Sequence, residues 1–416
     1  MPIFISCPEV IMNYCPLSRL YHQSENEWRK EYERRYASSS CRHFPFTIHQ
    51  YNHRKEWPAF LCYTEELMLL IQRIYRQHAA LTGLLRQLPS IAAMQYALSC
   101  LSDEVQSTNE IEGVKSTRRD IEDILQDRPI APRMHHLVSV VDKYAKILEH
   151  EDIPFSTCED IRRFYDEFAL EEVLQEHPDY APDGQIFRKG PVDITTAAAK
   201  TTHRGAYPED LIIRLISLSL QILHDESIPL LIRTAVFHYL FEYTHPFYDG
   251  NGRTGRFIVS YFLAKEFHEI IAFRFSVVVN KNKKRYYRML ADTDSEWNCG
   301  DLTPFVTWSL ELIDAAFDEA LTTLQRKSAQ IEKFRELLEE LTRGQDRLTR
   351  TLYDLLLQAA LFYGFGITME ELMRAAGKTR ATIQNRLHRM PPDHLVVFTE
   401  TRPYRYKLNL RLFTES

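Results

Sequence analysis

Residues 245–256 of this 416-residue chain read HPFYDGNGRTGR, and they lie between two segments with helical periodicity, 229–244 and 253–266. Pro246 helps to end the first helix, whereas the Gly-Asn-Gly run at 250–252 permits unusual backbone angles and exposes N–H groups. The second helix begins at this point, so its unpaired N–H groups and the positive end of its dipole face the loop. The segment therefore predicts an anion-binding site between two helices.

Four side chains of this segment supply the chemistry of phosphate transfer. Arg253 and Arg256 lie on one face of the first helical turn, where a cation is disfavoured unless an anionic ligand offsets its charge. Asp249 can hold Mg²⁺ against phosphates, and His245 can accept a proton from an attacking hydroxyl near neutral pH. Any one of these residues alone would fit a glycine turn with surface arginines, but the full set predicts transfer of a phosphate-containing group.

The segment resembles the signature of the Fic (Fido) family, H-P-F-x-D/E-G-N-G-R-x-x-R, at every defined position. The resemblance implies a helical enzyme that transfers AMP from ATP to a Ser, Thr or Tyr hydroxyl of a protein (AMPylation) and releases pyrophosphate. It implies that His245 is the general base and that Asp249 is the Mg²⁺ ligand. The Doc branch phosphorylates its target and has Lys in place of the second Gly, so Gly252 and Arg256 favour the AMP-transferring branch.

The resemblance also assigns the nucleotide contacts. It implies that the anion hole around the α- and β-phosphates consists of Gly250, Asn251 and Gly252, with Asn251 counted beside His245 as catalytic. Arg253 and Arg256 are expected to bind the β- and γ-phosphates.

A second motif lies upstream, where residues 108–113 read TNEIEG and match the family's inhibitory pattern S/T-x-x-x-E-G/N. The resemblance implies that Glu112 pairs with Arg256 and displaces the γ-phosphate of ATP, because a carboxylate satisfies the arginine fork that a phosphate would otherwise bind. Taken alone, the pattern is also that of a charged helix end. In some relatives the same glutamate supports removal of AMP, so a deAMPylase is an alternative function.

Two weaker resemblances concern the target and the adenosine. Residues 186–194 are predicted to form a short hairpin, which corresponds to the family's flap, where a target segment adds as an extra strand. Tyr287 fits a family tyrosine of the adenosine pocket. The position matched to a family asparagine is Asp294, a departure that bears on the adenine contacts and on nucleotide choice.

The periodicity of the chain predicts a mainly α fold with one small β excursion. We expect an N-terminal segment of unassigned structure at 1–63, a helical region at 64–330 that contains the inhibitory motif and the Fic domain, and a linker helix with a winged helix-turn-helix at 331–416. The whole chain carries a net charge of −6, yet twelve Lys and Arg face seven Asp and Glu from residue 341 onward. This difference suggests separate partners for the two parts.

Basic and amide side chains on the expected recognition helix and wing fit DNA, since basic residues contact phosphates and Gln or Asn reads base edges. These residues are Lys378, Arg380, Gln384, Asn385, Arg386 and Arg389, with Arg402 and Arg405 on the wing. A DNA-binding transcriptional regulator with an accessory Fic domain is therefore a further alternative. The same module would also fit protein docking or a homodimer.

Other features bound the location and the partners. No apolar run approaches the ~20 residues needed to cross a bilayer, and the N-terminus does not read as a signal peptide. We expect a cytoplasmic protein without a membrane partner, which acts on Mg-ATP and on a protein hydroxyl, including its own.

Overall fold

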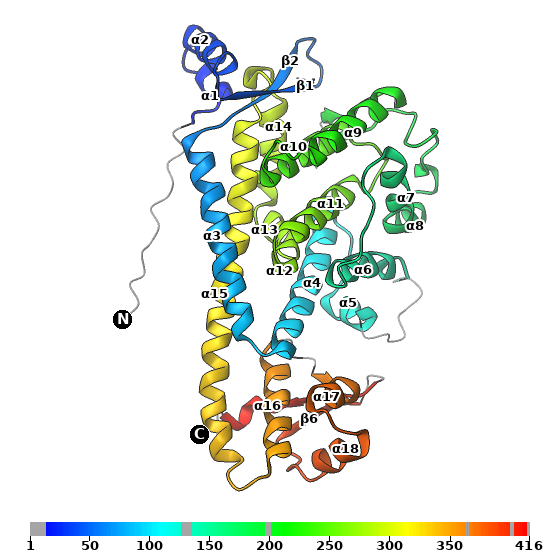
Figure 1. The fold of residues 1–416 in the computed structure, drawn as a ribbon. Helices are drawn as coiled ribbons and strands as arrows, with labels where there is room; N and C mark the ends of the chain where they lie inside the picture. The colour runs from blue at the N-terminus through cyan, green and yellow to red at the C-terminus, as the bar shows by residue number, and fades with distance from the viewer. Residues whose placement is uncertain are drawn as a thin grey trace.

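The computed structural model is mainly helical, as the periodicity predicts, and it describes residues 14–125, 135–195, 201–362, 364, 366–399 and 403–413. A single long helix, α15 (Thr303–Leu341), runs the length of the molecule beside α3 (Glu65–Gln87) and connects the body to the C-terminal elements (Figure 1). The expected boundary near residue 330 falls inside this helix.

The described part of the N-terminal segment contains a hairpin that the sequence left unassigned. Its elements are α1 (Leu17–Tyr21), α2 (Glu25–Tyr36), β1 (Cys41–His49) and β2 (Glu56–Cys62). The two strands pair antiparallel. Phe44, Phe46 and Ile48 alternate with exposed residues along β1, so one face of the hairpin packs on the body and the other meets solvent.

Among the described residues, the helices that follow are α3, α4 (Ser90–Glu112), α5 (Arg118–Leu125), α6 (His135–Leu148), α7 (Cys158–Phe168), α8 (Leu170–Glu176) and the short η2 (Pro178–Tyr180). Thr64 caps α3, since its hydroxyl accepts the Leu67 N–H at 3.1 Å. Helix α4 contains residues 108–112 of the upstream motif in its last turns. It ends because Gly113 adopts φ +82° and its N–H returns to the last helical carbonyls.

The hairpin predicted at 186–194 is displaced along the chain. The strands are β3 (Asp193–Thr195) and β4 (Thr201–Arg204), paired antiparallel, and we call this hairpin the flap. Residues 185–187 are not a strand, because their N–H groups donate to the Glu209 carboxylate. The expectation of strand 186–188 was therefore wrong: a side chain takes the place of a partner strand.

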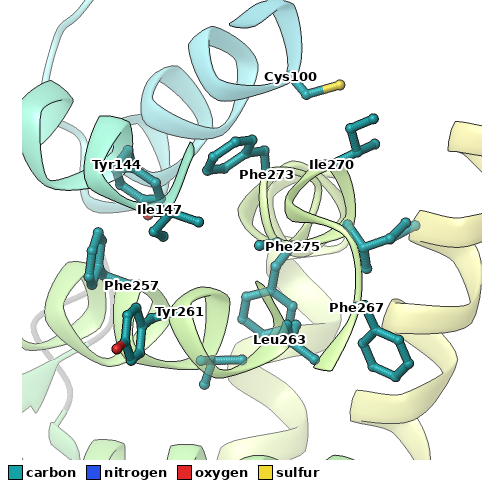
Figure 2. Close-up of a cluster of buried hydrophobic side chains, with 14 of the residues drawn as sticks. Cys100, Tyr144, Ile147, Phe257, Tyr261, Leu263, Phe267, Ile270, Phe273 and Phe275 are labelled. Atoms are coloured by element: carbon teal, nitrogen blue, oxygen red, sulfur yellow. The ribbon is translucent and has the colours of Figure 1, made fainter. Parts of the chain in front are cut away.

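The helices that position the predicted site form the centre of the body. They are α9 (Glu209–His224), α10 (Leu230–Thr244), α11 (Asn251–Glu266), α12 (Glu269–Ala272), α13 (Phe275–Lys281), α14 (Lys283–Asp294) and the short η3 (Glu296–Asn298). Helix α10 is buried on nearly all sides, as expected for a central helix. Aromatic side chains hold α11 against α6: the rings of Phe257 and Tyr144 lie 4.8 Å apart, next to Tyr261 (Figure 2).

The C-terminal elements are α16 (Arg347–Phe362), β5 (Ile367–Thr368), α17 (Met369–Ala376), α18 (Arg380–His388), β6 (Leu395–Phe398), β7 (Arg405–Leu408) and η4 (Leu410–Phe413). The sheet order is β5-β7-β6, and Thr368 and Glu371 form a capping box on α17. Helix α16 packs against both α4 and α15, so this module rests on the helix that carries the upstream motif (Figure 1).

Within the described residues, none of the helices combines the length and the apolar composition that a membrane crossing requires.

Candidate active site

The backbone between α10 and α11 makes the turn that the glycines predict. His245 ends α10 in the left-handed region, at φ +51°, and its N–H donates to Phe241 O at 2.9 Å. Gly250 precedes α11 with φ +77°, and a Cβ there would lie 3.2 Å from both Ala169 and Tyr165. The first helical bond runs from Thr254 N to Gly250 O, so the N–H groups of residues 251–253 have no helical partner.

The side-chain amide of Asn251 fixes the conformation of this loop through two hydrogen bonds to Phe247. Its Oδ1 accepts the Phe247 N–H at 2.8 Å, and its Nδ2 donates to the Phe247 carbonyl at 2.9 Å. The side chain is buried and both polar atoms are committed to the backbone. Asn251 therefore shapes the cradle, and only its backbone N–H faces a ligand.

Arg256 is fully buried and meets both defined ends of the upstream motif. Its Nε donates to Thr108 Oγ1 at 3.1 Å, and its Nη2 donates to the Thr108 carbonyl at 3.0 Å. Nη2 also lies 2.7 Å from Glu112 Oε1. Burial alone would lower the pKa of the Arg256 guanidinium, but the Glu112 carboxylate raises it, so the side chain stays charged.

The Glu112 carboxylate lies directly over Gly252. A Cβ at position 252 would overlap the Glu112 carboxylate and would lie 2.8 Å from Arg256 Nη1. The glycine thus leaves room for an anion at the start of α11, and in this structure that anion is the Glu112 side chain. Lys283 contacts the Ile111 carbonyl and so helps to hold the end of α4 in place.

Buried hydrogen-bond donors on α7 and α11 lack partners within the described residues. In the described part of the chain, Arg256 Nη1, Arg253 Nε and Tyr165 Oη are buried without a hydrogen-bond partner. Buried donors normally find acceptors. Arg256 Nη1 lies beside Gly252 and the Tyr165 ring lies beside Gly250, so the loop has donors that fit a ligand with anionic oxygens, such as a polyphosphate.

The two arginines of the motif differ in their partners. Arg253 is buried, and its Nη1 forms a 2.6 Å ion pair with Glu172 Oε2 of α8. Glu172 had no signal in the sequence, because acidic residues are common on any helix surface. Arg256 faces the upstream motif, whereas Arg253 ties α11 to α8.

His245 has the electrostatic state of a proton acceptor. Burial, together with the positive charges of His203 and Arg188, lowers the pKa of the His245 imidazole to about 3. The ring is therefore neutral at physiological pH and has a lone pair to accept a proton.

Arg188 holds the backbone of His245 in its left-handed conformation. The guanidinium is fully buried and donates to four carbonyls, those of Gly190, Ala206, Thr244 and His245, with the last at 2.9 Å. It joins the residues that flank the flap to the end of α10. The sequence places Arg188 in the predicted hairpin but has no feature that separates it from a surface arginine.

Asp249 is half-buried, and its Oδ1 accepts the Gly250 N–H at 2.6 Å. It forms no ion pair with any basic side chain that the structure describes, so its carboxylate charge is not neutralised. A single carboxylate beside a phosphate cradle is a donor set that suits Mg²⁺, which binds through few carboxylates and through substrate phosphates. Asp249 therefore fits the predicted role of metal ligand.

The structure separates the two residues expected near adenosine. Tyr287 is 42% exposed, and burial followed by the charge of Glu112 raises its pKa, which places the ring near Glu112. Asp294 instead is buried and contacts His203 and Tyr239. Both carboxylate oxygens of Asp294, at the position matched to the family asparagine, therefore have partners within the protein.

A buried acid also lies near the cradle. Burial raises the pKa of Glu242 to about 7, against the opposing effect of Arg256, and Glu242 Oε1 lies 3.0 Å from the place of a Cβ on Gly255. This acid on α10 was not predicted, since the surrounding helix reads as apolar.

Comparison with known proteins places this geometry in a family. Residues 157–263 match the Fic/DOC family, and residues 49–128 match a domain of unknown function, DUF4172. The protein adenylyltransferase fic-1 of Caenorhabditis elegans is 25% identical over 180 residues, 42% of this chain and 33% of that protein. A probable protein adenylyltransferase of Aquifex aeolicus is 30% identical over 102 residues, 24% of this chain and 29% of that protein. The chain thus spans about a third of the length of the curated relatives it matches.

A solved structure shows the same fold over most of the chain. It is a Fic family protein from Desulfovibrio desulfuricans G20, with a TM-score of 0.51 and 22% identity, covering 83% of this chain and 96% of that chain. The family match includes the loop from His245 to Arg256, where the structure shows the glycine turn, the buried arginines and the free helix N-terminus. On this evidence residues 157–263 of the chain form a domain of the Fic/DOC family.

Proposed function

We propose that the protein is an autoinhibited adenylyltransferase that transfers AMP from Mg-ATP to a Ser, Thr or Tyr hydroxyl of a protein, including its own. The observation that carries the proposal is the cradle at the start of α11, where Gly252 and Arg256 receive an anion within one helical turn of the His245 loop. The names of the curated relatives support the same reaction.

His245 would act as the general base. Its neutral imidazole takes the proton from the acceptor hydroxyl, whose oxygen forms a bond to the α-phosphorus of ATP. The bond between the α-phosphorus and the bridging oxygen breaks, and pyrophosphate leaves. The N–H groups of residues 251–253 donate to the phosphate oxygens and stabilise the charge that develops on them.

Three side chains would orient the nucleotide. Arg256 pairs with the terminal phosphates once Glu112 has moved, and Arg253 contributes its unpartnered Nε while Glu172 holds the rest of the guanidinium. Mg²⁺ held by Asp249 would neutralise charge on the phosphates. Tyr287, half-exposed beside the cradle, would stack against the adenosine.

Autoinhibition would arise because Glu112 and a terminal phosphate of ATP compete for the same space over Gly252. The Glu112 carboxylate occupies the space over Gly252 and neutralises Arg256, so a terminal phosphate cannot take the same place without displacing it. Because Glu112 is the last residue of α4, a small shift of this helix end would be enough to free Arg256.

Incorporation of label from α-labelled ATP into the purified protein tests the proposal. We expect low incorporation for the natural protein, strong incorporation for Glu112→Gly, and none for Glu112→Gly combined with His245→Ala. Equal incorporation in all three would exclude this catalytic assignment.

The deAMPylase alternative predicts that activity requires Glu112, whereas in the transfer reaction Glu112 inhibits. Pre-modified protein incubated with natural enzyme and with Glu112→Gly separates the two directions. Release of AMP that requires Glu112 would favour removal, whereas retention of AMP by both forms would favour transfer.

A second candidate function, DNA binding, is favoured by the exposure of α18. Only Ile383 and Leu387 of this helix are buried, whereas Arg380, Gln384 and Asn385 are exposed, as are the flanking Lys378 and Arg389. Two of the basic residues have partners within the protein: Arg386 forms a 2.9 Å ion pair with Asp346, and Arg405 is buried and donates to Gly366 O. Arg402 lies outside the described residues.

Binding to duplex DNA at several salt concentrations tests this second function. We expect Arg380→Ala with Arg389→Ala to weaken binding and to lower the salt slope by about two, because each lost phosphate contact removes about one unit. Arg29→Ala on α2, which also removes an exposed arginine, serves as the control. If the natural protein and the double variant bind DNA equally, α18 has no role in DNA binding.

A further inference from the structure

A buried ion pair joins the flap to α14. His203 of β4 is 8% exposed; its Nδ1 lies 2.9 Å from Asp294 Oδ2, and its Nε2 lies 2.7 Å from the Tyr243 carbonyl. Both partners are hydrogen-bond acceptors, so both ring nitrogens carry a proton and the imidazole is a cation. The flap is therefore attached to the helical body through a charge pair, in addition to backbone bonds.

Both carboxylate oxygens of Asp294 have partners in this ion pair and its surroundings. Its Oδ1 accepts the Tyr239 hydroxyl at 2.6 Å, and its Oδ2 faces His203. Both contacts bring a donor to the carboxylate, and an asparagine could accept only one of them, because its Nδ2 would face a second donor. The geometry thus explains the aspartate at the position where the family resemblance expects an asparagine, without any reference to adenine.

The ion pair lies close to the proposed general base. Tyr243, whose carbonyl receives His203 Nε2, is two residues before His245, and the His203 charge contributes to the low pKa of the His245 ring. On the flap itself, Arg204 pairs with Asp193 across the two strands at 2.5 Å. The acidic groups that interact with His203 from the neighbouring elements are Asp294, Glu242 and Asp193, and the neutral ring of His245 also senses its charge.

We propose that Asp294 and His203 form a charged anchor that fixes the flap beside the His245 loop, so that both are positioning residues and neither contacts the nucleotide. The proposal rests on the proposed function only for its kinetic consequence, because the anchoring of β4 can be measured without substrate. An anchored flap presents its free edge to the acceptor segment in one orientation, which lowers the ordering cost of docking.

Hydrogen exchange of the amides of residues 201–204 tests the anchor directly. We expect Asp294→Asn to speed their exchange at least tenfold while the exchange of α10 changes little. His203→Gln removes the residue of β4 from the same ion pair and should speed exchange to the same extent. This variant allows the test to be made even if Asp294→Asn does not fold. Asp292→Asn is the matched control, because it makes the same substitution at an exposed position of the same helix.

Combination of the two variants shows whether they act as one unit. If the anchor is correct, the double variant exchanges no faster than the faster single variant. Two independent effects that multiply would overturn the proposal, as would exchange at the natural rate in both single variants.

Kinetics in the Glu112→Gly background separate anchoring from nucleotide choice. We expect Asp294→Asn to raise KM for the protein acceptor at least fivefold and to leave KM for ATP and the ratio of ATP to GTP use unchanged. A changed nucleotide ratio with normal flap exchange would instead assign Asp294 to the adenine pocket. If no variant transfers AMP, the exchange experiment still decides the anchor, and only the proposed function fails.

Discussion

Glu112 Oε1 and Arg256 Nη2 lie 2.7 Å apart, across the space above Gly252. The arginine is fully buried and is held from the other side by Thr108, so it cannot turn away from the cradle. The glutamate is at a helix end and keeps 26% of its side chain exposed. The glutamate is thus the more easily displaced member of the pair.

The first prediction concerns the charge of Glu112. Glu112→Gln should raise incorporation of labelled AMP about ten- to hundredfold, because a hydrogen bond between charged groups contributes about 1.5–3 kcal/mol. Glu110→Gln is the matched control, since Glu110 accepts from Gln106 and Asn280 away from the cradle. It should change incorporation by no more than about twofold. Equal activation by both variants would mean that helix α4, and not the Glu112 charge, inhibits the enzyme.

The second prediction concerns the space over Gly252. In the Glu112→Gly background, Gly252→Ala should weaken ATP binding about tenfold, because the methyl group takes the place left for a phosphate and lies 2.8 Å from Arg256 Nη1. Titration calorimetry with Mg-ATP measures the effect. Gly83→Ala on α3, which has open space around it, is the control; unchanged affinity at 252 would place the phosphates elsewhere.

The third prediction concerns the protonation of His245. Because burial and two neighbouring cations lower its pKa to about 3 from 6.5, the ring should stay neutral between pH 8 and pH 5. The unfolded imidazole binds a proton near pH 6.5 and the folded one does not, so this group makes the protein less stable as the pH falls from 6.5 toward 3. Imidazole NMR signals, assigned by comparison with His245→Ala, report the titration. A midpoint near 6.5 would show that the ring is solvated.

The fourth prediction concerns Arg188. Arg188→Met should lower the free energy of unfolding by about 3 kcal/mol, because it leaves carbonyls of both the flap base and the His245 turn without a donor. Arg374→Met on α17 removes an exposed ion pair with Glu370 and should cost less than about 1 kcal/mol. Denaturant unfolding of both variants checks the difference. Similar losses would mean that the buried guanidinium does not hold the turn.

The helix termini were predictable from the sequence because their causes are local. Thr64 accepts the Leu67 N–H, Thr368 and Glu371 close a capping box, and Gly113 ends α4 in the left-handed region. Each of these features depends on residues within four positions of one another. The turn at Gly250 follows in the same way from residues that tolerate positive φ.

The strands of the flap and of the N-terminal hairpin were harder to predict from the sequence. A strand forms only beside a partner strand, and the residues of one strand do not show which segment will pair with it. Residues 186–188 look as suitable for a strand as residues 201–204, but Glu209 takes the N–H groups of the first segment. Strand β1 alternates buried and exposed residues, yet the histidines and the proline in its sequence hide the period.

By itself the sequence determined the helical class and the turn between His245 and Arg256, because a glycine turn and a helix N-terminus concentrate their chemistry within a few residues. The pairing of Glu112 with Arg256 was implied by the family resemblance, and the structure places the two side chains together. Only the tertiary structure decided that Glu172 binds Arg253, that Arg188 holds the His245 backbone and that Asp294 faces His203 instead of a nucleotide. A buried charge takes whichever opposite charge or carbonyl the packing brings to it, and that choice is made between segments far apart in the chain.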